Sequence, residues 1–397
     1  MHDNDRILEN RINRELIERV LPAQVLRRVP LASRANVLPG EPIDAATAIK
    51  GSFEPISAGT PWGRPWGTTW FRASGPVPDD PTAGSGLAES RCVTEVLCEI
   101  GFTAGMVGFS AEGAVYTLGD RGPEIRCGIH PMRRTVPLGL VTTGEEIDFW
   151  VEAASNPDFT TSFTANPMGS PATAGEDPLY TFGGFWMTTV DLEVRALIAE
   201  IGMLNDAMRV LPRGHRRRQR LAALFQRAYD RLDPADVRRT APGCREVLAE
   251  GFEWTSPPDS HLVSAVGHAH IDTAWLWPMR ETHRECARTF ANQVQLMEQY
   301  PQHRFACSQA QQYAWVEQDH PSLFERICER VETGQWVPVG GMWVEADMNL
   351  PSGESLVRQM VHGQRYFESR FGRRCDEVWI PDVFGYPGNL PQVYRSG

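Results

Sequence analysis

The residues best suited to chemistry lie in the sequence GHAHIDTAW at positions 267–275. They follow residues 262–266 (LVSAV), a short apolar run that predicts a buried strand. His270 and Asp272 are two residues apart, so their side chains point the same way on extended backbone. Imidazole nitrogens and carboxylate oxygens are both good ligands for a divalent metal of the zinc type. The pattern predicts a metal site at the end of a strand, with a structural His and a helix-capping Asp as the alternative.

A second segment has the same organisation further along the chain. Residues 377–381 (EVWIP) predict another strand, and Asp382 follows it directly in the sequence DVFGYPGN. The carboxyl ends of parallel strands are the places where sites assemble in α/β folds. We therefore expect Asp382 to lie near His270 and Asp272, with a capping or turn Asp as the alternative.

The elements around these residues alternate in type. From residue 260 onward, short apolar runs that predict strands are separated by longer stretches that predict helices. Repeated strand–helix steps imply a parallel sheet with helical crossovers. The strands are expected at 262–266, 304–308, 335–339 and 377–381, and the helices at 283–299, 309–319, 321–333 and 353–370.

The chain before residue 259 has a different texture. Apolar residues at helical spacing predict an amphipathic helix over 5–22, and short β-prone runs between Gly and Pro predict an antiparallel sandwich. The predicted fold class is therefore a multidomain α and β protein. Its predicted segments are an amino-terminal helical segment (1–50), a β-sandwich domain (51–191), a helical connector (192–258) and a parallel α/β domain (259–397).

The composition narrows the class of protein. With 42% hydrophobic and 22% charged residues, the 397-residue chain has enough apolar material for more than one core. The net charge of −11 argues against a nucleic-acid surface, and no run approaches the roughly 18 apolar residues of a membrane span. The eight cysteines are scattered without a CxxC pair, which is typical of reduced thiols. We expect a cytoplasmic protein without nucleic-acid or membrane partners.

The two segments with chemistry resemble the two leading signatures of the α-mannosidases of glycoside hydrolase family 38. The likeness rests on His270, Asp272 and Trp275 in the first segment and on the sequence WIPDVFGY at 379–386 in the second. The sequence at 340–355 is similar to the family's cytosolic-type members. A broader likeness covers residues 1 to 250, where WGRPWGTTWFR at 62–72 resembles their amino-terminal β domain.

The resemblance implies a role for each matching residue. His270 and Asp272 are implied to bind zinc, and Asp382 to be both the third ligand and the nucleophile. Trp275 and Phe384 fall where the family has aromatic residues lining the mannose pocket. Co²⁺ and Mn²⁺ are accepted by the same ligand types. The implied activity is that of a retaining, metal-dependent exo-α-mannosidase that removes terminal α-D-mannose from oligosaccharides.

The residue types suit this chemistry. A retaining glycosidase needs a carboxylate nucleophile and a second carboxyl group as acid/base, about 5–5.5 Å apart. Asp382 can supply the first role, because a neighbouring cation favours its ionised form. In the family the general acid and a fourth ligand, a His, lie well downstream of the nucleophile. The resemblance therefore implies that both lie beyond residue 397. The resemblance also implies that the chain is an amino-terminal fragment that holds part of a seven-stranded α/β barrel. Because cytosolic-type members of the family tend to assemble, it implies a homo-oligomer as well.

Other functions fit parts of the sequence. His268 and His270 form the His-x-His pair with which metal-dependent amidohydrolases begin. Such an enzyme needs further His ligands, for which His303 and His320 are the candidates. An inactive, truncated product that binds sugar is a third hypothesis.

Two smaller features have alternative interpretations. The tryptophans of residues 62–72 either present rings to a sugar or, as clustered tryptophans more often do, form core. Glu345 and Asp347 follow a predicted strand and either bind substrate hydroxyls or lie in a surface loop.

Overall fold

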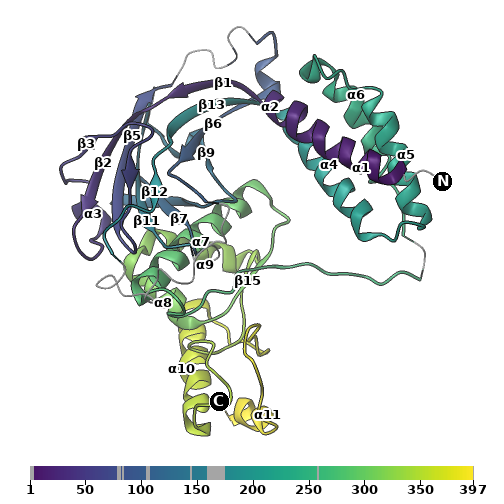
Figure 1. Ribbon diagram of the computed structural model, residues 1–397. Helices are drawn as coiled ribbons and strands as arrows, with labels where there is room; N and C mark the ends of the chain where they lie inside the picture. Colours follow the sequence, from purple (N-terminus) through teal and green to yellow (C-terminus); the bar gives the residue numbers. More distant parts are fainter. Residues whose placement is uncertain are drawn as a thin grey trace. The chain divides into compact units, whose positions relative to one another are not determined.

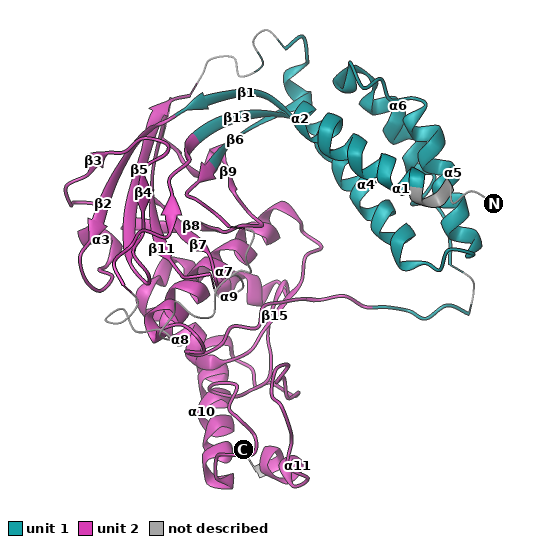
Figure 2. Ribbon diagram, viewed as in Figure 1, with its two compact units in different colours: residues 1–30, 78–97, 186–263 teal, residues 31–77, 98–185, 264–397 magenta. Residues whose placement is uncertain are grey.

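The computed structural model describes residues 4–77, 82, 85–103, 108–143, 145–158, 175–256 and 259–396. The chain divides into two compact units (Figure 2). Unit 1 comprises residues 1–30, 78–97 and 186–263, and unit 2 comprises residues 31–77, 98–185 and 264–397. The boundary falls inside two strands, β6 (Cys92–Glu99) and β13 (Gly184–Asp191).

Unit 1 is built mainly from helices (Figure 1). The predicted amino-terminal helix forms as α1 (Asn4–Glu15), a π-helical turn (Leu16–Val20) and α2 (Leu21–Ala23). The predicted connector contains three helices, which share one apolar core with α1: α4 (Leu192–Val210), α5 (Arg216–Tyr229) and α6 (Val237–Ala249). In α5, Leu221, Leu224, Phe225 and Ala228 repeat at helical spacing and are buried, which is why this sequence forms an amphipathic helix.

The chain enters β structure earlier than the sequence predicts. The strands β1 (Val25–Pro30) and β2 (Ala32–Leu38) both lie inside the segment predicted as amino-terminal and helical. β1 pairs antiparallel with β13 in unit 1. The reason is tertiary: strand pairing overrides the weak local preference of these short runs. The four-segment division of the chain stays a prediction.

Unit 2 contains an antiparallel sheet in the order β3-β2-β5-β11-β7-β8, with β10 pairing β11 (Figure 1). Its longer strands, besides β2, are β5 (Thr68–Pro76), β7 (Ala111–Gly119), β8 (Gly122–Ile129) and β11 (Glu146–Ser155). The short elements are α3 (Ala45–Ala48), β3 (Glu54–Pro55), β4 (Pro61–Trp62), β9 (Thr135–Pro137), β10 (Thr142–Thr143) and β12 (Tyr180–Thr181). The predicted antiparallel character of this region is confirmed.

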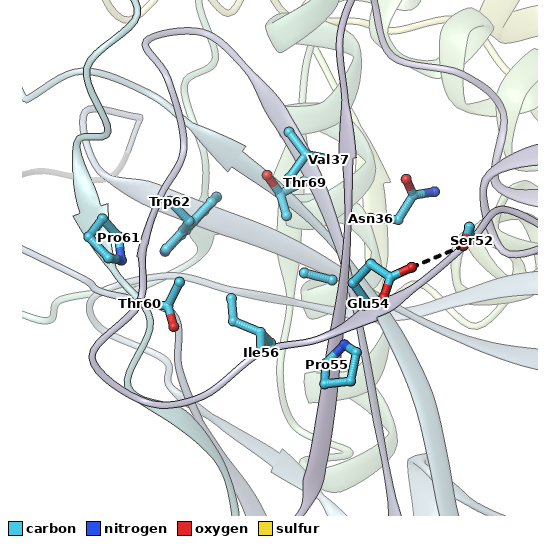
Figure 3. Close-up of a pocket in the computed structure, with 11 residues that line it drawn as sticks. Asn36, Val37, Ser52, Glu54, Pro55, Ile56, Thr60, Pro61, Trp62 and Thr69 are labelled. Atoms are coloured by element: carbon cyan, nitrogen blue, oxygen red, sulfur yellow. Dashed lines mark hydrogen bonds between the residues drawn. The ribbon is translucent and has the colours of Figure 1, made fainter.

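The clustered tryptophans are structural. Trp62, Trp66 and Trp70 are all buried. The indole of Trp62 donates to the carbonyl of Ile100 at 2.7 Å and meets Phe71 edge to face. Trp62 also lines a hollow of about 430 Å³ beside β2 and β3 (Figure 3). Rings packed in this way hold the sheet together, and none of the three offers an open face to a sugar.

The last part of unit 2 alternates strands and helices. Three parallel strands lie in the order β14 (Gly267–His268), β15 (Phe305–Cys307) and β16 (Trp336–Pro338). The helices are α7 (Met279–Gln299), α8 (Ala310–Asp319), α9 (Pro321–Glu332), α10 (Gly353–Phe371) and α11 (Leu390–Ser396). The predicted helices and two of the predicted strands are confirmed, with no end differing by more than four residues. Three strands do not make a barrel, so the seven-stranded barrel stays a prediction.

Two predicted strands do not form. Residues 262–266 make no strand; pairing begins at Gly267, opposite Phe305. In that parallel register residues 262–266 would face residues 300–304, which form the turn after α7 and cannot pair. Residues 377–381 are also irregular, since Pro381 has no N–H to donate and the neighbouring β16 is short and ends at a proline.

The sheet and the helices of unit 2 share one core. Trp70, Tyr116 and Trp150 from the sheet belong to the same apolar cluster as Phe290 of α7 and Phe305 of β15. No helix in the described ranges is both long and apolar enough to cross a membrane. All eight cysteines are free thiols.

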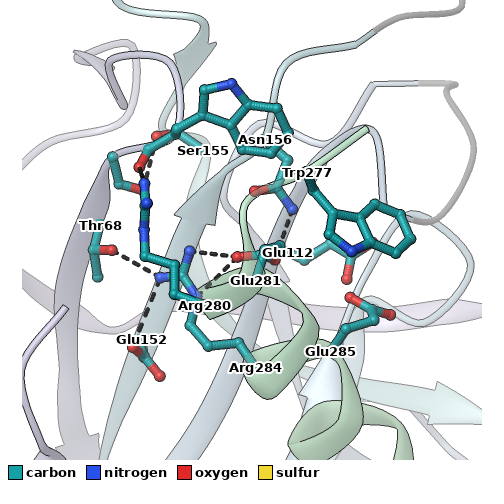
Figure 4. Close-up of polar contacts among 12 residues, drawn as sticks. Thr68, Glu112, Glu152, Ser155, Asn156, Trp277, Arg280, Glu281, Arg284 and Glu285 are labelled. Atoms are coloured by element: carbon teal, nitrogen blue, oxygen red, sulfur yellow. Dashed lines mark hydrogen bonds and ion pairs between the residues drawn. The ribbon is translucent and has the colours of Figure 1, made fainter. Parts of the chain in front are cut away.

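A layer of buried charges lies where α7 meets the sheet (Figure 4). Arg284 and Arg288 of α7 both pair with Glu281 one or two turns earlier on the same helix. Arg288 also pairs with Glu112 of β7 at 3.2 Å, and Arg284 lies 3.8 Å from Glu152 of β11. Charges this deeply buried need partners, so the layer fixes how α7 docks on the sheet.

Candidate metal centre

The backbone that carries His270 and Asp272 is pinned to the core between them. Ile271 is 3% exposed and belongs to the apolar cluster of unit 2. Its carbonyl accepts hydrogen bonds from the side-chain amides of Gln309 at 3.0 Å and Gln312 at 2.8 Å. Because neighbouring side chains on extended backbone alternate, His270 and Asp272 turn away from the core together.

The loop after Asp272 is closed by a single hydroxyl. Thr282, in the first turn of α7, donates to the carbonyl of Asp272 at 3.2 Å. The hydroxyl oxygen of Thr282 also accepts from the backbone N–H of Ala274 and from the indole N–H of Trp277, both at 3.0 Å. Ala274 has φ of 59°, a left-handed conformation that the closed loop imposes. Thr282 therefore determines the path of the backbone beside the site.

The second segment reaches the site through Trp379. Its indole N–H donates to Nε2 of His268 at 3.3 Å, and the two rings meet edge to face. Nδ1 of His268 lies 2.8 Å from the carbonyl of Ala306, so this nitrogen carries the proton and Nε2 accepts. This contact brings Asp382, three residues after Trp379, to the end of β14.

The three predicted ligands come together. One ligand atom from each of His270, Asp272 and Asp382 lies within 4.8 Å of the others. Nε2 of His270 is 3.4 Å from Oδ1 of Asp272 and 3.6 Å from Oδ2 of Asp382. The structure thus brings together the three side chains that the sequence singles out, while their roles as metal ligands stay a prediction.

A fourth polar group faces the same imidazole. Oε2 of Glu345 lies 3.1 Å from Nδ1 of His270, and the Glu345 side chain is 5% exposed. Its other oxygen accepts from the hydroxyl of Ser308 at 2.8 Å. From the sequence alone, Glu345 is expected either to bind substrate hydroxyls or to lie in a surface loop. The signal that could have found this contact is the position of Ser308 and Gln309 directly after β15, at the edge of the sheet where sites assemble.

The electrostatics of this group favour a cation. The contacts of His270 with Asp272 and then with Glu345 raise the pKa of His270 to about 10, although burial lowers it. Both ring nitrogens of His270 and Oε2 of Glu345 are shielded from solvent, and none makes a well-directed hydrogen bond. With Nε2 of His270 left without a hydrogen bond beside them, the carboxylates of Asp272 and Asp382 and this imidazole nitrogen form a donor set that fits a divalent metal ion.

The predicted aromatic residues are both exposed. Trp275 is 54% exposed and contacts Phe109 and Trp277, while Phe384 is 96% exposed. Their role in lining a sugar pocket stays a prediction. Asp347 is exposed too, and its carboxylate accepts from the backbone N–H groups of Asn349 and Leu350, so it stabilises a turn.

The His-x-His alternative lacks its first ligand. Both ring nitrogens of His268 are engaged, with Ala306 and with Trp379, and His268 is not part of the three-residue metal group. Nε2 of His303 contacts the side chain of Gln293 at 2.8 Å. His320 is half-buried directly before α9, and its ring packs against the ring of Tyr116. These histidines have structural contacts rather than a shared open site.

Comparison with known families gives two matches, one for each half of the chain. Residues 29–183 match the alpha-mannosidase jelly roll domain, and residues 260–397 match the glycosyl hydrolases family 38 N-terminal domain. The second match contains all three residues of the metal group.

Curated relatives agree with these matches. Alpha-mannosidase 2C1 of Homo sapiens is 33% identical over 379 residues, which are 92% of this chain and 33% of the human protein. Alpha-mannosidase G of Dictyostelium discoideum is 39% identical over 64% of this chain and 23% of its own length. The alpha-mannosidase of Saccharomyces cerevisiae is 39% identical over 52% of this chain and 20% of its own length. The chain thus spans a third or less of these relatives, and it belongs to the α-mannosidases of glycoside hydrolase family 38, whose amino-terminal region it carries.

Proposed function

We propose that this chain provides the nucleophile and three metal ligands of a retaining, metal-dependent α-mannosidase that removes terminal α-D-mannose from oligosaccharides. The observation that carries the proposal is the convergence of His270, Asp272 and Asp382 within 4.8 Å, from two segments more than a hundred residues apart. The family membership supplies the sugar class, and the donor set supplies the metal.

The proposed ligands differ in exposure in a way that suits their roles. The side chains of His270 and Asp272 are 26% and 33% exposed, whereas that of Asp382 is 55% exposed. A nucleophile has to reach the anomeric carbon of a bound sugar, so the most accessible carboxylate of the group is the best placed for it. His270 and Asp272 are held on backbone that is pinned by Ile271 and Thr282, and they serve as the fixed ligands.

A bound zinc ion would stabilise charge and orient sugar hydroxyls in this site, and cobalt or manganese would be alternatives with the same donors. Asp382, as an ionised carboxylate, attacks the anomeric carbon while the glycosidic C–O bond breaks and the leaving oxygen takes a proton from the general acid that the family resemblance implies. Water then hydrolyses the glycosyl ester on Asp382 and releases mannose. Trp275 and Phe384 present exposed rings that can pack on the sugar. Asp272 stays in place because Thr282 holds its carbonyl.

We also propose the wider setting that the family implies. The three parallel strands of unit 2 are part of a seven-stranded α/β barrel, and the jelly roll precedes it. Eight free thiols suit a reducing compartment, so the protein is proposed to be cytoplasmic, and homo-oligomers are proposed from the family resemblance.

The test is release of the phenol from an activated aryl α-D-mannoside, whose leaving group departs without a general acid, by the 397-residue chain with added zinc or cobalt, with a chelator, and with the Asp382→Asn variant. The proposal predicts phenol release that the chelator removes and that Asp382→Asn lowers by several orders of magnitude. An activated fluoro-mannosyl fluoride that traps glycosyl-enzyme intermediates is predicted to label the peptide containing Asp382. Chelator-resistant turnover, or labelling of another carboxylate, would contradict the assignment.

A further inference from the structure

Glu345 is a buried carboxylate that faces the Nδ1 edge of the His270 ring, which points away from the other two proposed ligands. Nδ1 of His270 faces Oε2 of Glu345 at 3.1 Å, and Nε2 faces Asp272 and Asp382. One ring nitrogen therefore faces Glu345 alone, and the other faces the two carboxylates proposed as metal ligands. Glu345 itself is 5% exposed, so its carboxylate cannot turn freely into solvent.

Glu345 is held both at its carboxylate and at its backbone. Oε1 accepts from the hydroxyl of Ser308 at 2.8 Å, directly after β15. The backbone N–H of Glu345 donates to Oε1 of Gln309 at 3.2 Å, and Gln309 also holds the carbonyl of Ile271. One glutamine side chain thus ties the backbone of Glu345 to the backbone next to His270.

The segment before Glu345 is also tethered on two sides. The first N–H groups of α8, from Ala310 and Gln311, donate to the carbonyls of Met342 and Trp343 at 3.1 and 2.9 Å. On the other side, Gln359 of α10 accepts from Trp343 through its carbonyl and from Val344 through its side chain. The chain beneath Glu345 is therefore held by hydrogen bonds from both α8 and α10, although it has no strand pairing.

Close packing of α10 leaves this segment no room to shift. Gly363 faces the backbone of Gly341 and Met342, and a β-carbon at this position would overlap both. Gly341 itself has φ of 68°, and a β-carbon there would meet the side chain of Gln364. Glycine at both positions lets the helix approach closely enough to fix the loop that carries Glu345.

We propose that Glu345 is a positioning residue: it orients the imidazole of His270 so that Nε2 is presented to the metal, with Nδ1–H directed to the Glu345 carboxylate. A carboxylate that accepts from the far nitrogen of a ligating histidine fixes its tautomer and ring angle and makes it a stronger ligand. The inference rests on the proposed metal site and adds to it a residue that touches neither metal nor sugar.

The test is the zinc affinity of the 397-residue chain, measured by competition with a chromophoric chelator for the wild type and for Glu345→Gln. The amide keeps the size of the side chain and removes the negative acceptor. The expected result is a dissociation constant weaker by about 10–100-fold, the usual effect of removing such a partner. Asp347→Asn is the matched control, because it removes a carboxylate two residues away that only stabilises a turn. Its affinity is expected to equal that of the wild type.

Two further readings separate positioning from a structural role. The thermal midpoint of the metal-free chain is expected to change little in Glu345→Gln, and the visible absorption of the Co²⁺-loaded chain is expected to change, because it reports ligand geometry. Ser308→Ala, which keeps the carboxylate but frees Oε1, is expected to weaken zinc binding less than Glu345→Gln does. Wild-type zinc affinity in both variants would overturn the role of Glu345 while leaving the metal site intact. Absence of zinc binding in the wild type would overturn the proposed site itself.

Discussion

The indole N–H of Trp379 donates to Nε2 of His268 at 3.3 Å, and this contact joins the two segments that supply the proposed ligands. Nε2 of His268 can accept because Nδ1, on the other side of the ring, donates its proton to the carbonyl of Ala306 on β15. Trp379 is thereby attached to the parallel sheet through a histidine, in place of the strand pairing that residues 377–381 lack. The position of Asp382 depends on this attachment.

Replacing Trp379 by Phe is therefore expected to weaken zinc binding. The ring packing is largely kept, but the donor is lost and Nε2 of His268 is left without its partner, at a cost of about 1–3 kcal/mol in unfolding free energy. The zinc dissociation constant is expected to rise several-fold, measured by chelator competition. Trp62→Phe is the control, because it removes a buried indole hydrogen bond in the jelly roll, to Ile100. That variant is expected to lose stability with zinc affinity unchanged; equal affinity in Trp379→Phe would separate Trp379 from the site.

Thr282 gives a second test of how the site is positioned. Thr282→Val keeps the shape of the side chain but leaves the N–H groups of Ala274 and Trp277 without their acceptor. The indole N–H of Trp277 is buried, and leaving it unsatisfied costs about 1–3 kcal/mol, so denaturant unfolding is expected to show a loss of that size. Zinc binding is expected to weaken as well, since the carbonyl of Asp272 loses its donor.

Thr282→Ser is the matched variant, since it retains the hydroxyl. It is expected to keep both the zinc affinity and most of the stability of the wild type. A serine variant as damaged as the valine variant would mean that the methyl group, rather than the hydrogen bonds, holds the loop.

The buried charges between α7 and the sheet predict two opposite results. Burial by itself raises the pKa of Glu281, but Arg284 and Arg288 outweigh it and hold the pKa at about 2. Glu281→Gln leaves both arginines undercompensated and is expected to cost about 3–5 kcal/mol of unfolding free energy at pH 7.

Burial, and then the charge of Glu285, raise the pKa of Glu112 well above its usual value. Glu112→Gln resembles the protonated acid and is expected to leave stability unchanged or higher.

The pH dependence follows from the sign of the Glu281 shift. Its pKa is lower in the folded chain than the ordinary value of 4.5, so its contribution is complete above that value and is lost as the pH falls towards 2. The difference in unfolding free energy between wild type and Glu281→Gln is therefore expected to shrink over that interval in urea unfolding at fixed ionic strength. A difference that stays constant down to pH 2 would contradict the assigned pKa.

The sequence predicts which side chains meet better than it predicts the strands that carry them. His270, Asp272 and Asp382 could be singled out because each follows an apolar run and falls in a segment that resembles a signature of the family, and their roles as ligands stay a prediction. The runs 262–266 and 377–381 were predicted as strands from apolar character alone, which does not contain the register. Gly267 pairs with Phe305, and this alignment, set by the length of α7 and its turn, leaves residues 262–266 without a partner.

Glu345 shows the other limit of prediction from sequence. Its distance to His270 depends on the loop after β16, on Gln309 and on the close approach at Gly363, which are contacts between distant parts of the chain. Helices α7 to α10 were predicted well because their apolar periodicity is local. Contacts that need three elements to meet are not contained in any single run of residues.

The most direct measurement of the central claim is a crystal structure of the chain with zinc, with anomalous diffraction recorded at the zinc absorption edge. The account predicts an anomalous peak bonded to Nε2 of His270 and to carboxylate oxygens of Asp272 and Asp382, at about 2.0–2.2 Å from each. It also predicts Nδ1 of His270 directed to Glu345. A saturated crystal with no peak at these residues, or with zinc bound through His268, would contradict it.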